Sequence, residues 1–254
     1  MKLFASDSRT QLKILSAVFS ILIVLSASSL ALSQQKVSRR FPAGKNVRFE
    51  LKNITGTITV ETWDRDEIAV TALMDNGKAT FNPRQTDGGL VIDIVGDNRG
   101  RTDIEMNFKI QLPARSSVDL ETHSGQINVR NVRGELVRAH IWTSGDIQLT
   151  GINASRVFAS NLSGDIFFDG DFTAGGTYEF KSGRGTISLQ LPASCGFHLV
   201  ATSMVKQRIS MGPFWDDRRM QSLGEGRRIT GDVGDGRASV TITNYQGDIK
   251  FFRR

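Results

Sequence analysis

The chain of 254 residues contains few groups that hold a protein together covalently or through a metal, since it has one cysteine and three histidines. The single cysteine, Cys195, excludes an internal disulfide, so the fold must be stabilised by burial of apolar side chains. No histidines are spaced as a metal-binding pair and no second sulfur is available, which argues against a zinc site. No histidine or basic cluster stands beside Cys195, so a structural thiol at a turn is favoured over a reactive one.

Long hydrophobic runs are also scarce. Residues 14–25 are nearly all apolar, but this run is shorter than the about twenty residues that span a membrane. Basic residues precede the run and Ala-Leu-Ser at 31–33 follows it, so we expect residues 1–33 to form a cleaved secretory signal helix, with an uncleaved anchor as the alternative. Residues 34–44 are expected to be a leader into the fold. The mature protein would be periplasmic, cell-surface or extracellular.

Charge of one sign is not concentrated anywhere in the chain. Lys and Arg number 32 against 26 Asp and Glu, and removal of residues 1–33 would leave a mildly basic protein. Because the bases are interspersed with acids, the charge pattern gives no support for nucleic-acid binding. An anionic envelope polymer, a lipid headgroup or a surface protein stays open as a partner.

Glycine is abundant, with 25 residues, and it marks a repeat. The phrase Ser-Gly-Asp-Ile or a near copy returns at Gly125, Gly145 and Gly164, a period of about twenty residues that is typical of stacked units. Related phrases surround Gly56, Gly185 and Gly247. An isoleucine follows two residues after each glycine: Ile58, Ile127, Ile147, Ile166, Ile187 and Ile249. A second apolar residue follows two positions later, and this period of two predicts half-buried strands whose isoleucines stack in one column.

The fold class predicted is therefore all-β, a β-solenoid or β-helix-like stack of short strands. We expect residues 45–254 to form one domain, interrupted by an irregular basic insertion at 204–228. The alternating run before Gly145 is shifted by one residue relative to its neighbours, which predicts a β-bulge there. Strands at 238–243 and 248–252 are expected to close the stack.

With these repeats in view, the chain resembles the bacterial "putative adhesin" family of unknown function, whose members repeat Thr-x-Ser-Gly-Asp-Ile on a β-solenoid-like scaffold. The resemblance covers about residue 45 to the C-terminus and rests on THSGQI, TSGDI, LSGDI and QGDI. Two segments that begin Leu-Pro-Ala, at Leu112 and Leu191, support it. The resemblance implies adhesion or surface interaction, some relatives resemble envelope-stress sensors, and no catalytic residue is carried over.

Asp146 and Asp165 are weak candidates for a metal site or for acid/base chemistry. They occupy the same place in neighbouring repeats, so stacking would bring their carboxylates to within about 5 Å. The competing explanation is that aspartate after glycine favours the turn. Gln126 and Thr186 interrupt the column and weaken a continuous calcium ladder. We expect no cofactor.

The insertion at 204–228 contains the residues expected to bind a surface. These surface-binding candidates are Phe214, Trp215, Arg218, Arg219, Arg227 and Arg228. Aromatic rings beside cations suit an anionic polymer or a membrane surface. The alternative is a solvated loop that covers one end of the stack.

The sequence therefore predicts an exported, adhesin-like interaction module of the cell envelope or surface, without enzymatic activity. One alternative is a polysaccharide-active β-helical enzyme that uses Asp146, Asp165 and Arg184. The other alternative is the sensor domain of an envelope-stress response.

Overall fold

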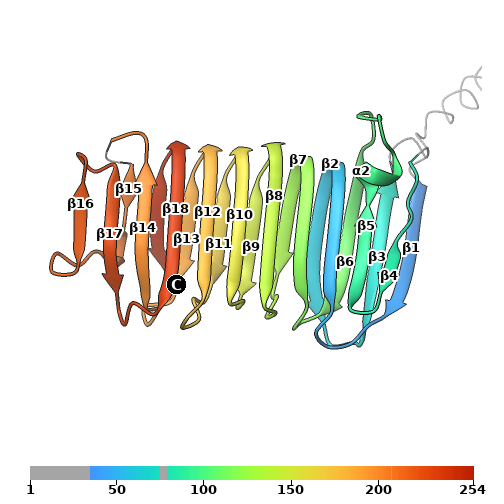
Figure 1. The fold of residues 1–254 in the computed structure, drawn as a ribbon, viewed down its shortest axis with the longest axis horizontal. Helices are drawn as coiled ribbons and strands as arrows, with labels where there is room; N and C mark the ends of the chain where they lie inside the picture. The colour runs from blue at the N-terminus through green and yellow to red at the C-terminus, as the bar shows by residue number, and fades with distance from the viewer. Residues whose placement is uncertain (1–34, 75–78, 207) are drawn as a thin grey trace, which may run out of the picture.

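The described part of the chain comprises residues 35–74, 79–206 and 208–254 of a computed structural model, and it forms an elongated β-solenoid (Figure 1). The predicted signal segment, residues 1–33, lies outside these ranges. Within them, no helix is long and apolar enough to cross a membrane. The 19 strands make one continuous hydrogen-bonded sheet that folds into two layers, because β2 and β7 each run through both. The all-β solenoid predicted from the repeat is confirmed.

The first layer holds the strand that precedes each repeat glycine. In stacking order it consists of β4 (Arg84–Thr86), β5 (Gly89–Asp93), β2 (Arg48–Trp63), β7 (Ser117–Arg130), β8 (Leu136–Ser144), β10 (Arg156–Ser163), β12 (Thr177–Arg184), β18 (Ala238–Gln246), β14 (Phe197–Ser203), β17 (Arg228–Val233) and β16 (Met220–Leu223). Its central strands, from β5 to β14, are parallel.

The second layer holds the strand that follows each glycine. It contains β1 (Gln35–Pro42), β3 (Glu67–Met74), β6 (Met106–Pro113), the later parts of β2 and β7, β9 (Ile147–Ile152), β11 (Ile166–Gly170), β13 (Ile187–Leu191), β19 (Ile249–Arg253) and β15 (Ile209–Ser210). A short helix, α2 (Ile94–Asp97), follows β5. A 3-10 helix, η1 (Gly212–Phe214), lies between β15 and β16.

The predicted isoleucine column is confirmed as the spine of the second layer. Direct pairing joins Ile127 to Ile147, Ile147 to Ile166, Ile166 to Ile187 and Ile187 to Ile249. Each of these side chains is at most 1% exposed. Because a parallel register places identical positions side by side, a single repeated residue fills one continuous layer of the core.

The repeat glycines form a second ladder at the corner between the layers. Gly145 and Gly164 have positive φ values of 150° and 124°. A Cβ on Gly145 would stand 1.6 Å from the carbonyl oxygen of Gly125, and one on Gly164 would stand 2.2 Å from that of Gly145. Neighbouring coils therefore approach too closely at this corner for any residue that carries a side chain.

Buried polar side chains line the corner just before the glycines. Asn161 donates from Nδ2 to the carbonyl oxygen of Gly145 at 2.9 Å, and Asn244 donates to that of Gly185 at 2.8 Å. Both asparagines are at least 94% buried. Their amides satisfy carbonyls that the sharp corner removes from the regular strand ladder.

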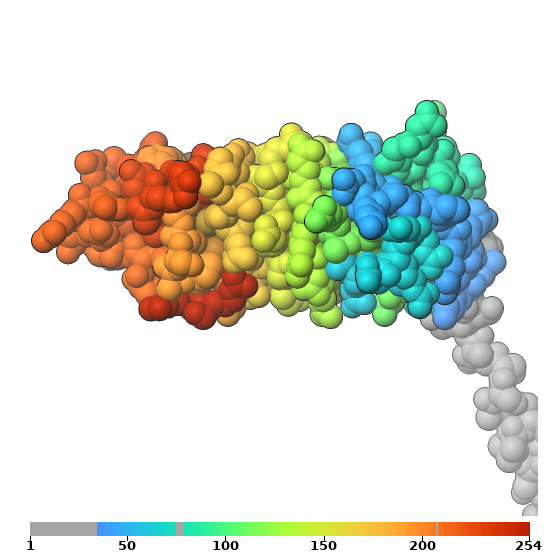
Figure 2. Space-filling model, turned by 90° about the horizontal axis from the view of Figure 1, so that it is seen from below, coloured from blue at the N-terminus to red at the C-terminus, as the bar shows by residue number. Residues whose placement is uncertain are grey.

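The coil order differs from the chain order at the C-terminal end, which corrects one prediction. The sequence predicts that the last coil, β18 and β19, closes the stack. Instead it lies between the coil of β12 and β13 and the coil of β14 and β15, and it pairs with both. Figure 2 shows the red C-terminal segment set back from the tip of the body, which is orange.

The insertion at 204–228 lies at that end of the solenoid, where β15 pairs with β19 and β16 pairs with β17, so it is not the solvated loop of the alternative prediction. The prediction that Phe214 binds a surface is wrong. Its side chain is 7% exposed, and its ring centroid lies 6.3 Å from that of Phe197 and 6.4 Å from that of Phe251. Phe214 is thus part of the core that closes the solenoid.

The predicted leader, residues 34–44, is also corrected, because residues 35–42 form strand β1, which pairs antiparallel with β3. Only Val37 and Phe41 pack partly against the core. The arginines and the proline of this strand suit a sheet edge, which has no second neighbour to pair with. This weak inward pattern explains why the strand was not recognised.

Candidate functional site

The predicted surface-binding residues of the insertion are mostly engaged in local contacts. Trp215 is 41% exposed, but its Nε1 donates to Asp217 at 2.5 Å. Arg219 donates to the carbonyl oxygen of Gly234 at 2.7 Å. Arg227 likewise bonds a carbonyl in its own turn, and Arg218 and Arg228 are exposed. The structure does not gather these side chains around one groove or pocket.

The two aspartates of the repeat bind the backbone of the next coil. Asp146 Oδ1 accepts the N–H of Asp165 at 2.8 Å, and Asp165 Oδ1 accepts the N–H of Thr186 at 2.7 Å. Asp248, in the last coil, is held by Arg208 and Lys250, each at 2.9 Å. The hydrogen bond with Lys250 is the main cause that holds the pKa of Asp248 below its usual range. These contacts give the aspartates a structural role at the corner.

A shallow groove of about 650 Å³ crosses the outer face of the first layer over β8, β10, β12 and β18, which stand side by side in the middle of the body (Figure 1). Three large apolar side chains line it and are unusually open: Trp142 is 56% exposed, Leu162 61% and Tyr245 42%. Gly183 stands at the same level on β12. We call this surface, lined by Trp142, Leu162, Gly183 and Tyr245, the aromatic groove.

The alternation of the strands explains why these residues point outward. Each follows an inward residue at the corner, namely Ile141, Asn161, Ser182 and Asn244, which are aligned across the four strands. Neighbouring strands lie about 4.8 Å apart, so the row from the first strand to the fourth spans roughly 14 Å. The row runs along the long axis of the solenoid.

Gly183 keeps the middle of the aromatic groove open. A Cβ at this position would lie 2.4 Å from the carbonyl oxygen of Leu162 and 3.1 Å from its Cδ1 atom. No side chain is therefore tolerated between Leu162 and Tyr245 without a shift of the backbone. The hollow is fixed by paired strands rather than by loops.

A polar row lies beside the aromatic groove. His140 Nδ1 and Ser160 Oγ are 2.5 Å apart, and the His140 ring packs edge-on against Trp142 with centroids separated by 4.6 Å. Burial lowers the pKa of His140 below its usual value of 6.5, so the imidazole is neutral at pH 7. A neutral imidazole and a hydroxyl can each donate and accept hydrogen bonds.

The groove lining is positively charged. Lys181 Nζ stands 5.8 Å from the centroid of the Tyr245 ring, and Arg184 Nε donates to Gln246 Oε1 at 3.2 Å. Within the described ranges, neither cation forms a salt bridge and no carboxylate belongs to the lining. Glu121, which is paired with His140 on the neighbouring strand β7, borders the groove without being part of its lining and accepts a hydrogen bond from Trp142 Nε1 at 2.6 Å.

Sequence analysis missed the aromatic groove, although its signal was present. Leu162 and Tyr245 each stand two residues before a repeat glycine, whereas Trp142 stands three residues before Gly145. The predicted bulge in β8 is confirmed, since Ile141 pairs with Asn161 but Ser144 pairs with Ser163. That extra residue displaces Trp142 from the alignment and hides the row.

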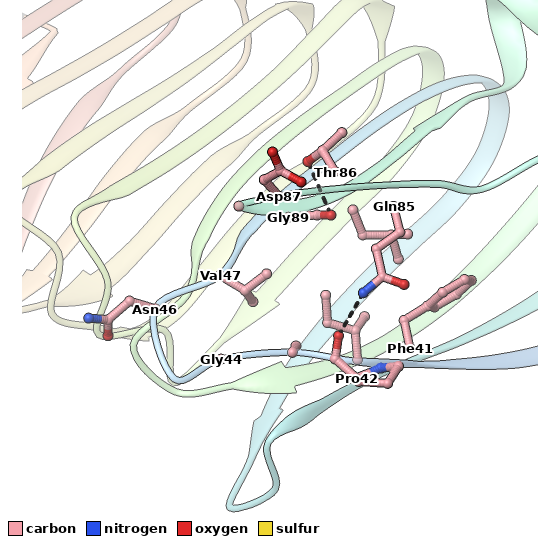
Figure 3. A pocket seen from close by; sticks show the side chains of 13 residues that line it. Phe41, Pro42, Gly44, Asn46, Val47, Gln85, Thr86, Asp87 and Gly89 are labelled. Carbon is pink, nitrogen blue, oxygen red and sulfur yellow. Dashed lines mark hydrogen bonds between the residues drawn. The ribbon is translucent and has the colours of Figure 1, made fainter.

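Two other hollows are weaker candidates. One, of about 170 Å³, lies between the β1–β2 connection and the β4–β5 turn, where Gln85 donates to the carbonyl oxygen of Pro42 (Figure 3). Among the described residues of its lining, Asp87 is the one that carries a charge. The other, of about 530 Å³, lies near Trp63 and the same β1–β2 connection, and its arginines and lysine are interspersed with Asp64 and Asp66. The first hollow has about a quarter of the volume of the aromatic groove, and the lining of the second mixes charges of both signs.

No group of three or more potential metal ligands is present in the ranges described.

A family model described as "Toastrack DUF4097" matches residues 34–251. No curated protein matches the chain in sequence.

Among solved structures, a "putative cell adhesion protein" from Clostridium sporogenes is 15% identical, with a TM-score of 0.55 over 87% of this chain and 100% of that one. A "putative adhesin" from Bacteroides fragilis is 10% identical, with a TM-score of 0.30 over 87% and 98%. A "putative lipid binding protein" from Parabacteroides distasonis is 13% identical, with a TM-score of 0.35 over 85% and 96%. The similarity to the Clostridium protein is one of fold.

Proposed function

Since the chain belongs to the Toastrack DUF4097 family, a domain of unknown function, we propose that it is a non-enzymatic interaction module that binds an extended partner through the aromatic groove. The observation that carries this proposal is the row of exposed apolar side chains, Trp142, Leu162 and Tyr245, on adjacent paired strands. Exposed apolar surface of this kind marks sites of interaction. A rigid sheet also loses little conformational freedom on binding.

Export to the periplasm, the cell surface or the medium is part of this proposal. Its support is the sequence pattern of residues 1–33. The names of the adhesin-like solved structures agree with a role in surface contact.

The polysaccharide-active enzyme is the less favoured function. Asp146 and Asp165 each hold a backbone N–H of the neighbouring coil, so their carboxylates are already engaged. Retaining and inverting glycosidases need two carboxylates that face the scissile bond. Arg184 lies at the aromatic groove, whose described lining holds no carboxylate.

The proposed function is tested by co-sedimentation of the purified full-length protein with insoluble bacterial envelope fractions. We expect Trp142→Ala and Tyr245→Ala each to reduce the bound fraction about tenfold, as is typical when an aromatic anchor is truncated. Both side chains are on the surface, so the fold should be kept, and circular dichroism checks this.

Trp215→Ala is the matched control, because Trp215 is also an exposed tryptophan but lies outside the aromatic groove. We expect it to bind as the wild type does. If Trp215→Ala abolished sedimentation while the groove variants bound normally, the insertion would be the contact surface and the groove proposal would be wrong.

A further inference from the structure

We propose that the occupant of the aromatic groove is an acidic glycan strand that lies along the solenoid axis, across β8, β10, β12 and β18. This inference rests on the proposed function, because it names the partner of the same site. It follows from three properties of the groove, namely its shape, its combination of apolar and hydrogen-bonding groups, and its charge.

The shape favours an extended chain. Trp142 and Tyr245 stand at the two ends of a row that spans three strand spacings, roughly 14 Å. Leu162 and Gly183 stand between them, and Gly183 adds no side chain of its own to the hollow. A ligand must therefore be long and narrow to contact both rings.

The chemistry of the lining favours sugar rings. A pyranose presents C–H groups on its faces and hydroxyls around its rim, so it can pack on an exposed aromatic ring while it exchanges hydrogen bonds at its edge. Trp142 and Tyr245 offer such rings. His140 and Ser160 offer hydrogen-bonding groups in the adjacent row.

The charge of the lining favours an acidic glycan over a neutral one. Lys181 and Arg184 are the charged side chains among the described lining residues, and the structure shows no salt bridge to either. Glu179, the outward neighbour of Lys181 on β12, lies outside the lining. A carboxylate, sulfate or phosphate group on the glycan would supply the missing negative charge.

The same observations disfavour a peptide and a membrane. All four strands are paired on both sides, so no free edge is available to extend the sheet with a peptide strand. Membrane binding favours several cations around an apolar surface that inserts into the bilayer. Here the apolar residues border a hollow of about 650 Å³, which a flat bilayer would leave empty.

The test uses isothermal titration of the purified full-length protein with oligomers of a uronic acid, such as alginate fragments. The comparison ligand is the same oligomer after its carboxyl groups are reduced to alcohols. We expect the acidic oligomer to bind and the reduced one to bind about tenfold more weakly. Binding should also change the tryptophan fluorescence, and Trp142→Phe should remove that change. Lys181→Gln with Arg184→Gln should abolish the preference for the acidic oligomer and keep the fold.

Equal affinity for the acidic and the reduced oligomer, or wild-type affinity in Trp142→Ala, would overturn the assignment of an acidic glycan to the groove. Binding of vesicles that contain one-third phosphatidylglycerol, if it depends on Trp142 while the oligomers fail to bind, would also overturn it. In any of these three cases, a loss of envelope sedimentation in Trp142→Ala would still support the groove as the contact surface. The two proposals therefore fail separately.

Discussion

Gly164→Ala tests the central feature of this fold, the close approach of neighbouring coils at the corner. The added Cβ would lie 2.2 Å from the carbonyl oxygen of Gly145 and 2.8 Å from Asp146 Oδ1. Both atoms belong to a coil that is packed on its other side as well, so it cannot move away alone. Gly164 also has φ at 124°, which side-chain-bearing residues rarely adopt.

The expected cost follows from two contributions. A residue held in such a conformation loses about 1–3 kcal/mol. Relief of the collision requires the two coils to separate, which weakens the bonds that join them, from Gly145 N to Ser163 O at 2.8 Å and from Ile147 N to Asp165 O at 2.9 Å. Each backbone hydrogen bond contributes about 1 kcal/mol, so we expect Gly164→Ala to lower the free energy of unfolding by about 3–5 kcal/mol.

Urea unfolding followed by circular dichroism measures this loss, and two glycines serve as controls. Gly175 has φ at 76° with open space around a Cβ, so Gly175→Ala isolates the conformational cost of about 1–2 kcal/mol. Gly44 has open space and no positive φ, so Gly44→Ala should be nearly neutral. If Gly164→Ala unfolded at the same urea concentration as Gly44→Ala, the close-approach explanation of the repeat glycine would be refuted.

Three further predictions concern side chains outside the groove. Phe214→Ala should lower the free energy of unfolding by about 3–5 kcal/mol, because its ring is buried in the core. Trp215→Ala should change it by less than about 1 kcal/mol, so urea titration of both variants distinguishes a core role from a surface role. Lys250 holds the pKa of Asp248 below its usual 3.8, so the pair stabilises the fold above that pH and the stabilisation is lost as pH falls through the lowered pKa. Asp248→Asn should therefore bring the free energies of unfolding at pH 7 and pH 3 closer together, by less than about 1 kcal/mol at this partly exposed site. An unchanged difference would contradict the pairing. Burial raises the pKa of Cys195 to about 11 from 9.0. Iodoacetamide at pH 8 should therefore alkylate this thiol about a hundredfold more slowly in the folded protein than in urea. Equal rates would show that the thiol is accessible.

The repeat was readable from the sequence because parallel stacking converts a periodic residue into a spatial column. Ile127, Ile147 and Ile166 stand at the same place after a glycine, which predicts that they lie side by side in the core. In the structure Ile147 pairs directly with each of the other two. The bulge in β8 was equally visible, since one extra residue shifts an alternating pattern.

The features that sequence analysis missed depend on which faces and edges meet, and alternation alone does not specify this. Phe214 was predicted to be at the surface because it lies among arginines, yet the open end of the stack needs an apolar cover. Strand β1 was missed because an edge strand buries little and tolerates Arg39, Arg40 and Pro42.

The position of the last coil, β18 and β19, between two earlier coils links the chain order to the proposed function. If coils stacked in the order of the sequence, β14 would lie beside β12 and would place Met204 next to Gly183. In the structure β18 takes that place, with Ser182 paired to Asn244, and so Tyr245 completes the aromatic groove. The groove therefore combines residues 142 and 245, about a hundred positions apart, and it exists only once the C-terminal coil has entered the stack. That coil pairs on both sides, so its removal would expose two sheet edges and would also delete one wall of the groove. A C-terminal truncation would therefore lower the stability of the solenoid and the binding at the groove together.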